Sequence, residues 1–183
     1  MPDSYYRQLK LGWSGSAGLH YILNSGIGLG MNYRFFASGA DEWAAIDPKD
    51  GVNMYYGQMK ENIYVNYVGP SLLTIQSSGK GDKLRITSAV SSGLMIYRNE
   101  ASVIQNNLLL TGKALGTSLD SSLEYFFVKN IALGIHLGLF ASKLKKATVN
   151  DGTTHTTIDL PKEQYENVSA IDLSAGLKIY LNK

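Results

Sequence analysis

A set of ionisable residues recurs along the chain at alternating positions, between apolar residues. If the alternating segments are β-strands, these side chains all project to one face, because successive side chains point to opposite faces. Acids, bases and imidazoles brought together in this way could form ion pairs, pass protons or act as a catalytic cluster. The set comprises Lys10, His20, Arg34, Arg85, Asp120, Glu124, His136, Asp172 and Lys178.

Each unpaired charge in an enclosed interior costs roughly several kcal/mol, so we expect these charges to be paired or hydrated. The favoured interpretation is a salt-bridged plug of side chains. A proton or ion path, or a catalytic cluster, is the alternative.

Other chemistry has weaker support in the sequence. His155 lies in a long polar segment, away from His20 and His136, so the three histidines do not predict one metal site. The chain has no cysteine, so it has no disulfide and no thiolate ligand. The spaced glycines of Gly26–Gly30 lack the strand-to-helix context of a nucleotide fingerprint. A net charge of +2, with scattered Lys and Arg, does not suggest nucleic acid. We therefore expect no metal and no cofactor.

The alternation that positions the ionisable set is clearest in the segment Ile131–Ser142. One face of this segment is small, polar or aromatic and includes His136. The other face is a continuous aliphatic band formed by Ile131, Leu133, Ile135, Leu137 and Leu139.

The same pattern predicts seven strands joined by alternating short and long connections. In an up-and-down meander, every second connection lies at the same end, so all short turns share one end and all long loops the other. The predicted strands are roughly Arg7–Leu23, Ile27–Ala37, Asn62–Gln76, Lys83–Arg98, Leu108–Phe127, Ile131–Lys143 and Val168–Leu181, with a local break or bulge at Gly69–Pro70. Counted along these strands, Asp120 and His136 fall near mid-height, Arg34 and Asp172 nearer the long loops, and Arg85, Glu124 and Lys178 nearer the short turns.

No predicted helix or second sheet is available to cover the aliphatic face, and charged residues make up only 17% of the chain, against about 25% in typical soluble domains. The sequence therefore predicts an all-β fold, an antiparallel up-and-down meander that forms a transmembrane β-barrel over residues 1–183. Short turns at one end and long loops at the other are typical of outer-membrane barrels.

Strand directions predict one strand more than the seven. An antiparallel barrel needs first and last strands of opposite direction, and hence an even number of strands. We expect an eighth strand before Met1, and the absence of a signal peptide at the start of the chain fits the same expectation.

Aromatic residues and long loops suggest how such a barrel would meet its surroundings. Aromatic girdles at the lipid headgroups are predicted for Trp13, Tyr21, Tyr33, Phe35, Tyr125 and Phe127. A surface ligand or protein partner could bind at loops 38–60 and 145–166, because binding residues commonly lie on loops of a rigid scaffold.

Five segments carry a resemblance to a known family: Ser16–Arg34, Asn66–Ser71, Leu110–Gly116, Tyr125–Leu139 and Ile171–Tyr180. Together they resemble the small outer-membrane β-barrel proteins of Bacteroidetes-type bacteria. The resemblance implies a location in the outer membrane of a Gram-negative-type cell, contact with its lipid bilayer and a further N-terminal strand. It implies no catalytic residues.

Three functions follow as expectations. The first is a non-enzymatic outer-membrane barrel with a structural, envelope or surface-recognition role and a filled interior. The second is a soluble lipocalin-like barrel, whose aliphatic face would point inward around a small hydrophobic ligand. The third is a lipid-modifying barrel enzyme, for which no nucleophile–base pair stands out.

Overall fold

The computed structural model describes residues 3–23, 26–46, 55–78, 83–103 and 106–181. One short helix, α1 (Asp3–Lys10), precedes the strands. The strands are β1 (Gly12–Ile22), β2 (Ile27–Ile46), β3 (Tyr55–Ser78), β4 (Leu84–Val103), β5 (Asn106–Val128), β6 (Ile131–Leu144), β7 (Lys146–Asn150), β8 (His155–Asp159) and β9 (Glu166–Ile179), with a 3₁₀ turn at Lys162–Gln164.

The strands form one antiparallel up-and-down sheet in the order β1-β2-β3-β4-β5-β6-β9. This confirms the predicted all-β antiparallel meander, and the main path contains the seven predicted strands. Within the described residues the sheet has nine strands, because β7 and β8 form a hairpin that branches off β5. The predicted loop 145–166 thus contains a short β-hairpin and a 3₁₀ turn.

Two predicted connections are largely strand. The predicted loop 38–60 is strand up to Ile46 and again from Tyr55, and β2 pairs with β3 from Ile27↔Thr74 to Ile46↔Tyr55. The connection between the predicted strands Lys83–Arg98 and Leu108–Phe127 is similarly shortened, because β4 and β5 pair as far as Val103↔Asn106. In both segments, small and polar residues interrupt the alternation of apolar and polar side chains. The backbone hydrogen bonds of the β2–β3 and β4–β5 ladders nevertheless continue through them. Residues 24–25, 47–54, 79–82 and 104–105 lie outside the described residues.

The start of the first strand was predicted wrongly. Residues 3–10 form α1, and the strand begins only at Gly12. Tyr5 is buried against Ala40 and Met59 on the inner face of β2 and β3, and its hydroxyl donates a hydrogen bond to Glu61. The contacts of Tyr5 with β2 and β3, which are distant in sequence, thus stabilise a helix where the local alternation predicts a strand.

The Gly69–Pro70 interruption leaves the register unchanged. The β3–β4 pairs on either side of it, Val68↔Leu94 and Ser71↔Ser91, continue the same register. The predicted break is therefore a local gap in one ladder without a bulge. Gly69 faces Gly93 so closely that a Cβ on either residue would overlap the opposite backbone.

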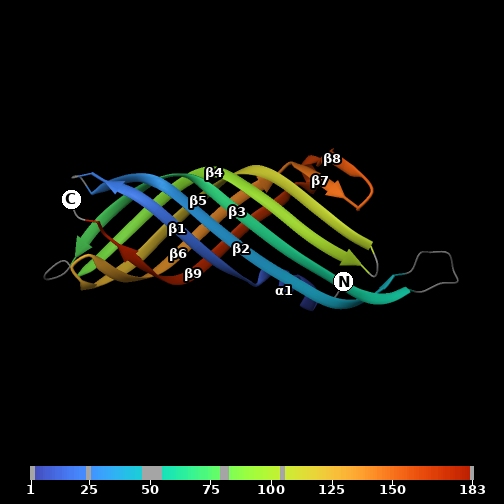
Figure 1. Cartoon of the computed structure of the whole chain (residues 1–183), viewed down its shortest axis with the longest axis horizontal. Helices are drawn as coiled ribbons and strands as arrows, with labels where there is room; N and C mark the ends of the chain where they lie inside the picture. The colour runs from blue at the N-terminus through green and yellow to red at the C-terminus, as the bar shows by residue number, and fades with distance from the viewer. Residues whose placement is uncertain (1–2, 24–25, 47–54, 79–82, 104–105, 182–183) are drawn as a thin grey trace.

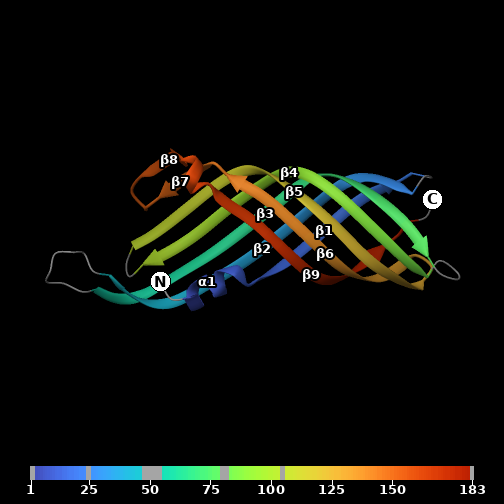
Figure 2. The same ribbon diagram turned by 180° about the vertical axis from the view of Figure 1, so that it is seen from behind.

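The sheet curls until its two edge strands, β1 and β9, come near each other (Figures 1 and 2). No ladder joins β1 to β9 among the described residues. The two edges run in the same direction, because the main path has seven strands, edges included, that alternate in direction. They therefore cannot pair as antiparallel neighbours, and the sheet is open along this seam.

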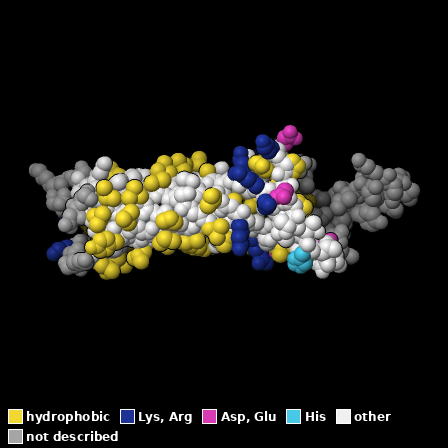
Figure 3. Space-filling model, turned by 90° about the horizontal axis from the view of Figure 1, so that it is seen from above, with side chains coloured by type: hydrophobic (Ala, Val, Ile, Leu, Met, Phe, Trp, Pro, Cys, Tyr) yellow, Lys and Arg dark blue, Asp and Glu magenta, His cyan; other side chains and the backbone are white. Residues whose placement is uncertain are grey.

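The two faces of the curled sheet differ sharply in chemistry. Along β6, the convex face exposes about half of each of Leu133, Ile135 and Leu137 (55%, 60% and 49%), whereas Ala132 on the concave face is fully buried. In Figure 3, hydrophobic side chains are spread over the convex face on the side of the basic side chains that lies to the left. The concave face carries the buried charges.

Candidate functional site

A group of polar side chains around Arg34, here called the central cluster, crosses the interior of the curled sheet. The Arg34 guanidinium, on β2, donates from Nη1 to Asp172 Oδ2 of β9 at 2.5 Å and from Nη2 to Asp120 of β5. Ser118 Oγ and Asn32 Nδ2 also donate to Asp120 Oδ2, at 2.6 and 3.0 Å. One cation from the β1–β2 side thus joins two carboxylates from the β5–β9 side.

The strand register explains why Arg34 fits between the two carboxylates. Asp120 pairs with Gly138 on β6, and Gly138 pairs with Asp172 on β9, so the three residues form one cross-strand row. A Cβ on Gly138 would overlap the Arg34 guanidinium and the Asp172 carboxylate. The Arg34 guanidinium therefore occupies the space that a side chain at position 138 would fill.

His136 lies beside the same two carboxylates. Its Nε2 is 3.2 Å from Asp120 Oδ1 and 3.9 Å from Asp172 Oδ1. The same nitrogen is buried and makes no hydrogen bond of good geometry. His136 is therefore placed to interact electrostatically with the carboxylates without being part of the hydrogen-bonded network.

A second group, the turn-side cluster, surrounds Glu124 closer to the short turns. Glu124 is fully buried. Its Oε1 accepts from Lys178 Nζ at 2.5 Å and from Thr87 Oγ1 at 2.6 Å, and its Oε2 accepts from Tyr180 Oη at 2.6 Å. Lys178 also donates to Ser122 Oγ at 2.6 Å.

Arg85 completes the turn-side cluster by stacking. Its guanidinium carbon lies 4.5 Å from the ring centroids of both Phe126 and Tyr180. Stacking between two rings is a favourable arrangement for a guanidinium, and the β4–β5 register places Arg85 directly opposite Glu124.

Seven of the nine ionisable residues of the sequence prediction lie in these two clusters. His20 and Lys10 do not. His20 Nε2 lies 3.0 Å from Ser71 Oγ on the neighbouring part of the concave face. Lys10 is the last residue of α1 and is exposed, so its predicted place on an inward strand face is wrong.

Several partners in the clusters were missed by the sequence analysis. Ser118, Asn32, Thr87, Ser122 and Tyr180 hold the carboxylates, and all occupy concave positions of the alternation. The alternation could have placed them on that face. Only the register identifies which carboxylate each one reaches.

The interior above the central cluster, towards the long loops, is apolar. Here Val65, Tyr67, Met95, Tyr97, Phe140 and Leu144 pack together with Ala147. Tyr67 is almost fully buried, and its hydroxyl donates to Ser91 Oγ at 2.9 Å. Polar and apolar layers therefore both fill the interior.

A side cavity of about 220 Å³ lies along the seam between β1 and β9. It is lined by Gly12 and Ser14 of β1, by Asp172 and Leu173 of β9 and, from the interior, by Arg34 and Phe140. Lys10 also lines it. The open seam thus leads directly to the central cluster.

The predicted girdle residues lie on the convex face at two levels. Trp13 and Phe35 pack with ring centroids 4.9 Å apart on the half of β1–β2 away from the short turn, with Tyr33 beside them. Tyr21, Tyr125 and Phe127 lie near the short turns and are all more than half exposed, at 59%, 51% and 56%.

Two ionisable groups at the long-loop end have shifted pKa values. Burial of the Tyr5 hydroxyl, together with the adjacent Glu61 carboxylate, raises the pKa of Tyr5 well above its ordinary value. In the β7–β8 turn, hydrogen bonds from the backbone and side chains of Thr154 and Thr153 hold the pKa of Asp151 below its ordinary range. Both groups stabilise local structure at the end of the sheet.

No family model matches this chain, and neither does any curated protein sequence. Within the described ranges, no group of three or more histidine and acidic side chains is arranged to hold a metal ion. The described part of the chain also contains no helix of the length and apolarity needed to cross a membrane.

Proposed function

We propose that this protein is an integral outer-membrane β-barrel with a structural, envelope or surface-recognition role and an interior filled by side chains. The observation that carries the proposal is the reversed distribution of polarity. Glu124 and Arg34 are almost completely buried on the concave face, while aliphatic side chains cover the exposed convex face. Exposed apolar surface of this extent is typical of a surface that meets lipid.

The direction of the aliphatic face favours this function over a lipocalin-like one. A soluble barrel that binds a hydrophobic ligand would point Ile135 and Leu137 inward, whereas both are exposed on the convex face. The concave face offers charged, hydrogen-bonded groups in their place.

Barrel closure is part of the proposal. The edges β1 and β9 run in the same direction and leave a seam with a side cavity. One strand running antiparallel to both edges would pair with each and complete an eight-stranded barrel.

The filled interior supports a role other than passage of solutes. An eight-stranded barrel has an interior that side chains just fill. The two polar clusters and the apolar layer around Tyr67 and Phe140 occupy it from the short turns towards the long loops. A surface partner would then bind at the protruding ends of β2–β3 or at the β7–β8 hairpin, within the regions 38–60 and 145–166. The resemblance to outer-membrane barrels of Bacteroidetes-type bacteria supports the location.

The absence of cysteine in the sequence makes a clean test possible. Ala89 and Val90 are neighbours on β4, the first 9% exposed on the concave face and the second 46% exposed on the convex face. Each would be replaced by cysteine, as Ala89→Cys and Val90→Cys, labelled with a nitroxide and reconstituted in lipid vesicles. We expect the Val90→Cys label to collide strongly with lipid-soluble oxygen and weakly with a water-soluble nickel chelate.

The Ala89→Cys label serves as the matched control, and we expect it to be shielded from both relaxing agents. Greater exposure of the Val90→Cys label to the nickel chelate than to oxygen would contradict the proposal. So would recovery of the unmodified chain as a folded monomer without detergent or lipid.

A further inference from the structure

The apolar convex face ends, on its long-loop side, at a row of basic side chains. On β4, Arg98 follows the exposed Leu94 and Ile96 at the next convex position. On β5, Lys113 occupies the convex position before the exposed Leu115, and on β6, Lys143 occupies the convex position after Leu139 and Ala141. Figure 3 shows Lys and Arg side chains gathered across the molecule where the apolar surface ends.

The strand register makes these three residues neighbours. Arg98 pairs with Thr111, so Lys113 lies two residues away on the adjacent strand, on the same face. The β5–β6 ladder ends at Gly116↔Ser142, so Lys143 lies just beyond its last pair, near Leu115 and on the same face as Lys113. Diagonal neighbours of this kind are about 7–8 Å apart, a distance at which two cationic side chains can share one phosphate group.

The basic row has little acidic compensation among the described residues. Arg98 forms an ion pair with Glu100 at 2.5 Å, and the nearby Lys146 pairs with Asp159 at 3.1 Å. Lys113 has no ion pair in the described part of the chain, and Lys143 lies 6.0 Å from the Tyr165 ring centroid. Two exposed cations are therefore available next to an apolar surface.

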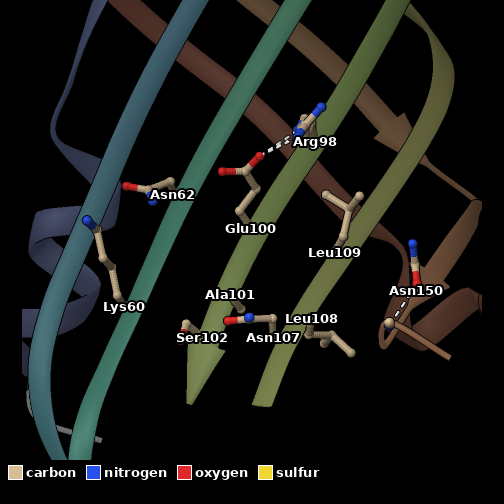
Figure 4. Close-up of a pocket in the computed structure, with 11 residues that line it drawn as sticks. Lys60, Asn62, Arg98, Glu100, Ala101, Ser102, Asn107, Leu108, Leu109 and Asn150 are labelled. Atoms are coloured by element: carbon tan, nitrogen blue, oxygen red, sulfur yellow. Dashed lines mark hydrogen bonds and ion pairs between the residues drawn. The ribbon is translucent and has the colours of Figure 1, made fainter. Parts of the chain in front are cut away.

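A surface cavity of about 410 Å³ lies directly beyond Arg98, on the side away from the apolar surface. Its lining includes Lys60, Asn62, Arg98, Glu100, Asn107 and Asn150 (Figure 4). Amides and a carboxylate beside a cation are the groups that hydrogen-bond sugar hydroxyls, and the volume is within the range of small-ligand sites.

We propose that this surface binds a lipid whose headgroup is a phosphorylated sugar. Its phosphate is held by the row Arg98, Lys113 and Lys143, its sugar lies in the adjoining cavity, and its acyl chains cover Leu94, Leu115 and Leu139. The order of apolar, cationic and amide-rich surfaces along the strands matches the order of acyl chain, phosphate and sugar in such a lipid. This inference rests on the proposed membrane location.

The test uses the full chain reconstituted in neutral phosphatidylcholine vesicles. One preparation contains a bisphosphorylated glucosamine-disaccharide lipid, and another contains phosphatidylglycerol at equal negative charge. Native mass spectrometry then counts the lipid retained on the protein. We expect retention of the phosphorylated glycolipid in preference to phosphatidylglycerol.

Variants then connect the preference to the basic row. The double variant Lys113→Gln/Lys143→Gln is expected to lower glycolipid retention about 30-fold, from about fivefold per basic residue near anionic headgroups. The matched control is Lys83→Gln/Lys129→Gln, which removes two exposed lysines at the short-turn end and is expected to leave retention unchanged.

Three outcomes would overturn the inference: equal retention of both lipids, unchanged retention in the Lys113→Gln/Lys143→Gln variant, or equal losses in the two double variants. Insertion into neutral vesicles, measured separately by resistance to carbonate extraction, distinguishes the two proposals. A chain that inserts without headgroup preference contradicts only this inference. A chain that does not insert into any vesicle contradicts the membrane function and this inference together.

Discussion

The central and turn-side clusters are built on the same plan but stabilise different parts of the sheet. In each, a carboxylate of β5 faces a glycine of β6, Asp120 with Gly138 and Glu124 with Gly134. The cation of the central cluster comes from β2 and reaches across the interior. The cation of the turn-side cluster, Lys178, comes from β9, which is only two strands away from β5.

This difference in origin has a physical consequence. Arg34 connects the two halves of the curled sheet, so its ion pairs oppose opening of the sheet at the seam. Lys178 links β9 to β5, two strands that are already held together by the ladders each forms with β6. The balance of charge also differs, since Arg34 faces two carboxylates, whereas Lys178 and Arg85 share the surroundings of Glu124. The comparison predicts that the central cluster is the more sensitive to substitution.

The largest effect is expected for Arg34→Ala. This change leaves Asp120 and Asp172 close together without a cation, and loss of one partner of a buried ion pair costs about 3 to 5 kcal/mol. The free energy of unfolding is measured by urea titration in detergent micelles, with heat-dependent gel migration as the readout of folded protein.

The triple variant Arg34→Met/Asp120→Asn/Asp172→Asn is the control for the charge argument. Because it removes all three charges together, we expect it to recover most of the stability that Arg34→Ala loses. An Arg34→Ala protein as stable as the unmodified chain would show that the central cluster does not hold the sheet together.

A smaller effect is expected for Gly138→Ala, which places a methyl group where the Arg34 guanidinium lies. Overpacking of this kind costs about 1 to 3 kcal/mol. In the matched variant Gly134→Ala, the new Cβ would lie 3.3 Å from both Glu124 Cγ and the Leu123 carbonyl oxygen, a milder overlap, and the expected loss is under about 1 kcal/mol. If the two variants lost equal free energy of unfolding in the same urea titration, the two clusters would not differ in how tightly they pack around the glycine.

For Lys178→Met, we expect a loss of about 1 to 2 kcal/mol. Thr87, Ser122 and Tyr180 still donate hydrogen bonds to Glu124, and the Lys178 side chain is 35% exposed, so solvent screens part of its charge. Lys129→Met, at an exposed turn lysine, is the control for loss of a positive charge. If Lys178→Met proves more destabilising than Arg34→Ala, the order of the two clusters is reversed.

The smallest effect is expected for His136→Gln. Its Nε2 lies 3.2 Å from Asp120 Oδ1 but makes no hydrogen bond of good geometry. The free energy of unfolding at pH 7 should therefore change by less than about 1 kcal/mol. A loss above about 2 kcal/mol would make His136 a structural member of the central cluster, on a par with Asp172.

Much of the fold is predictable from local alternation, because the period of two directly reports which side chains share a face. The seven strands of the main path and the two faces of β6 follow from it. The helix at residues 3–10 and the extension of β2 to Ile46 do not follow. Both depend on contacts with residues distant in sequence, such as Tyr5 with Met59 and Ala45 with Tyr56.

The site shows the same division. Alternation places Arg34, Asp120 and Asp172 on one face. Counting along the strands puts Asp120 near mid-height and Arg34 and Asp172 nearer the long loops, whereas the register aligns Asp120 and Asp172 in one cross-strand row. Lys10 has the same local pattern but belongs to the helix. The roles of Gly138 and Ser118 have no local signal, because glycine and serine are common at concave positions throughout the chain.

The order of residues alone specifies most of the strands and the apolar and polar faces, since each depends on near neighbours. Which charges meet is decided only by the tertiary structure. Arg34 reaches Asp120 and Asp172 because the sheet curls and because the strand register aligns Gly138 between the two carboxylates. Curvature and register are cooperative properties of the whole sheet, so the residue pattern of a single segment does not indicate them.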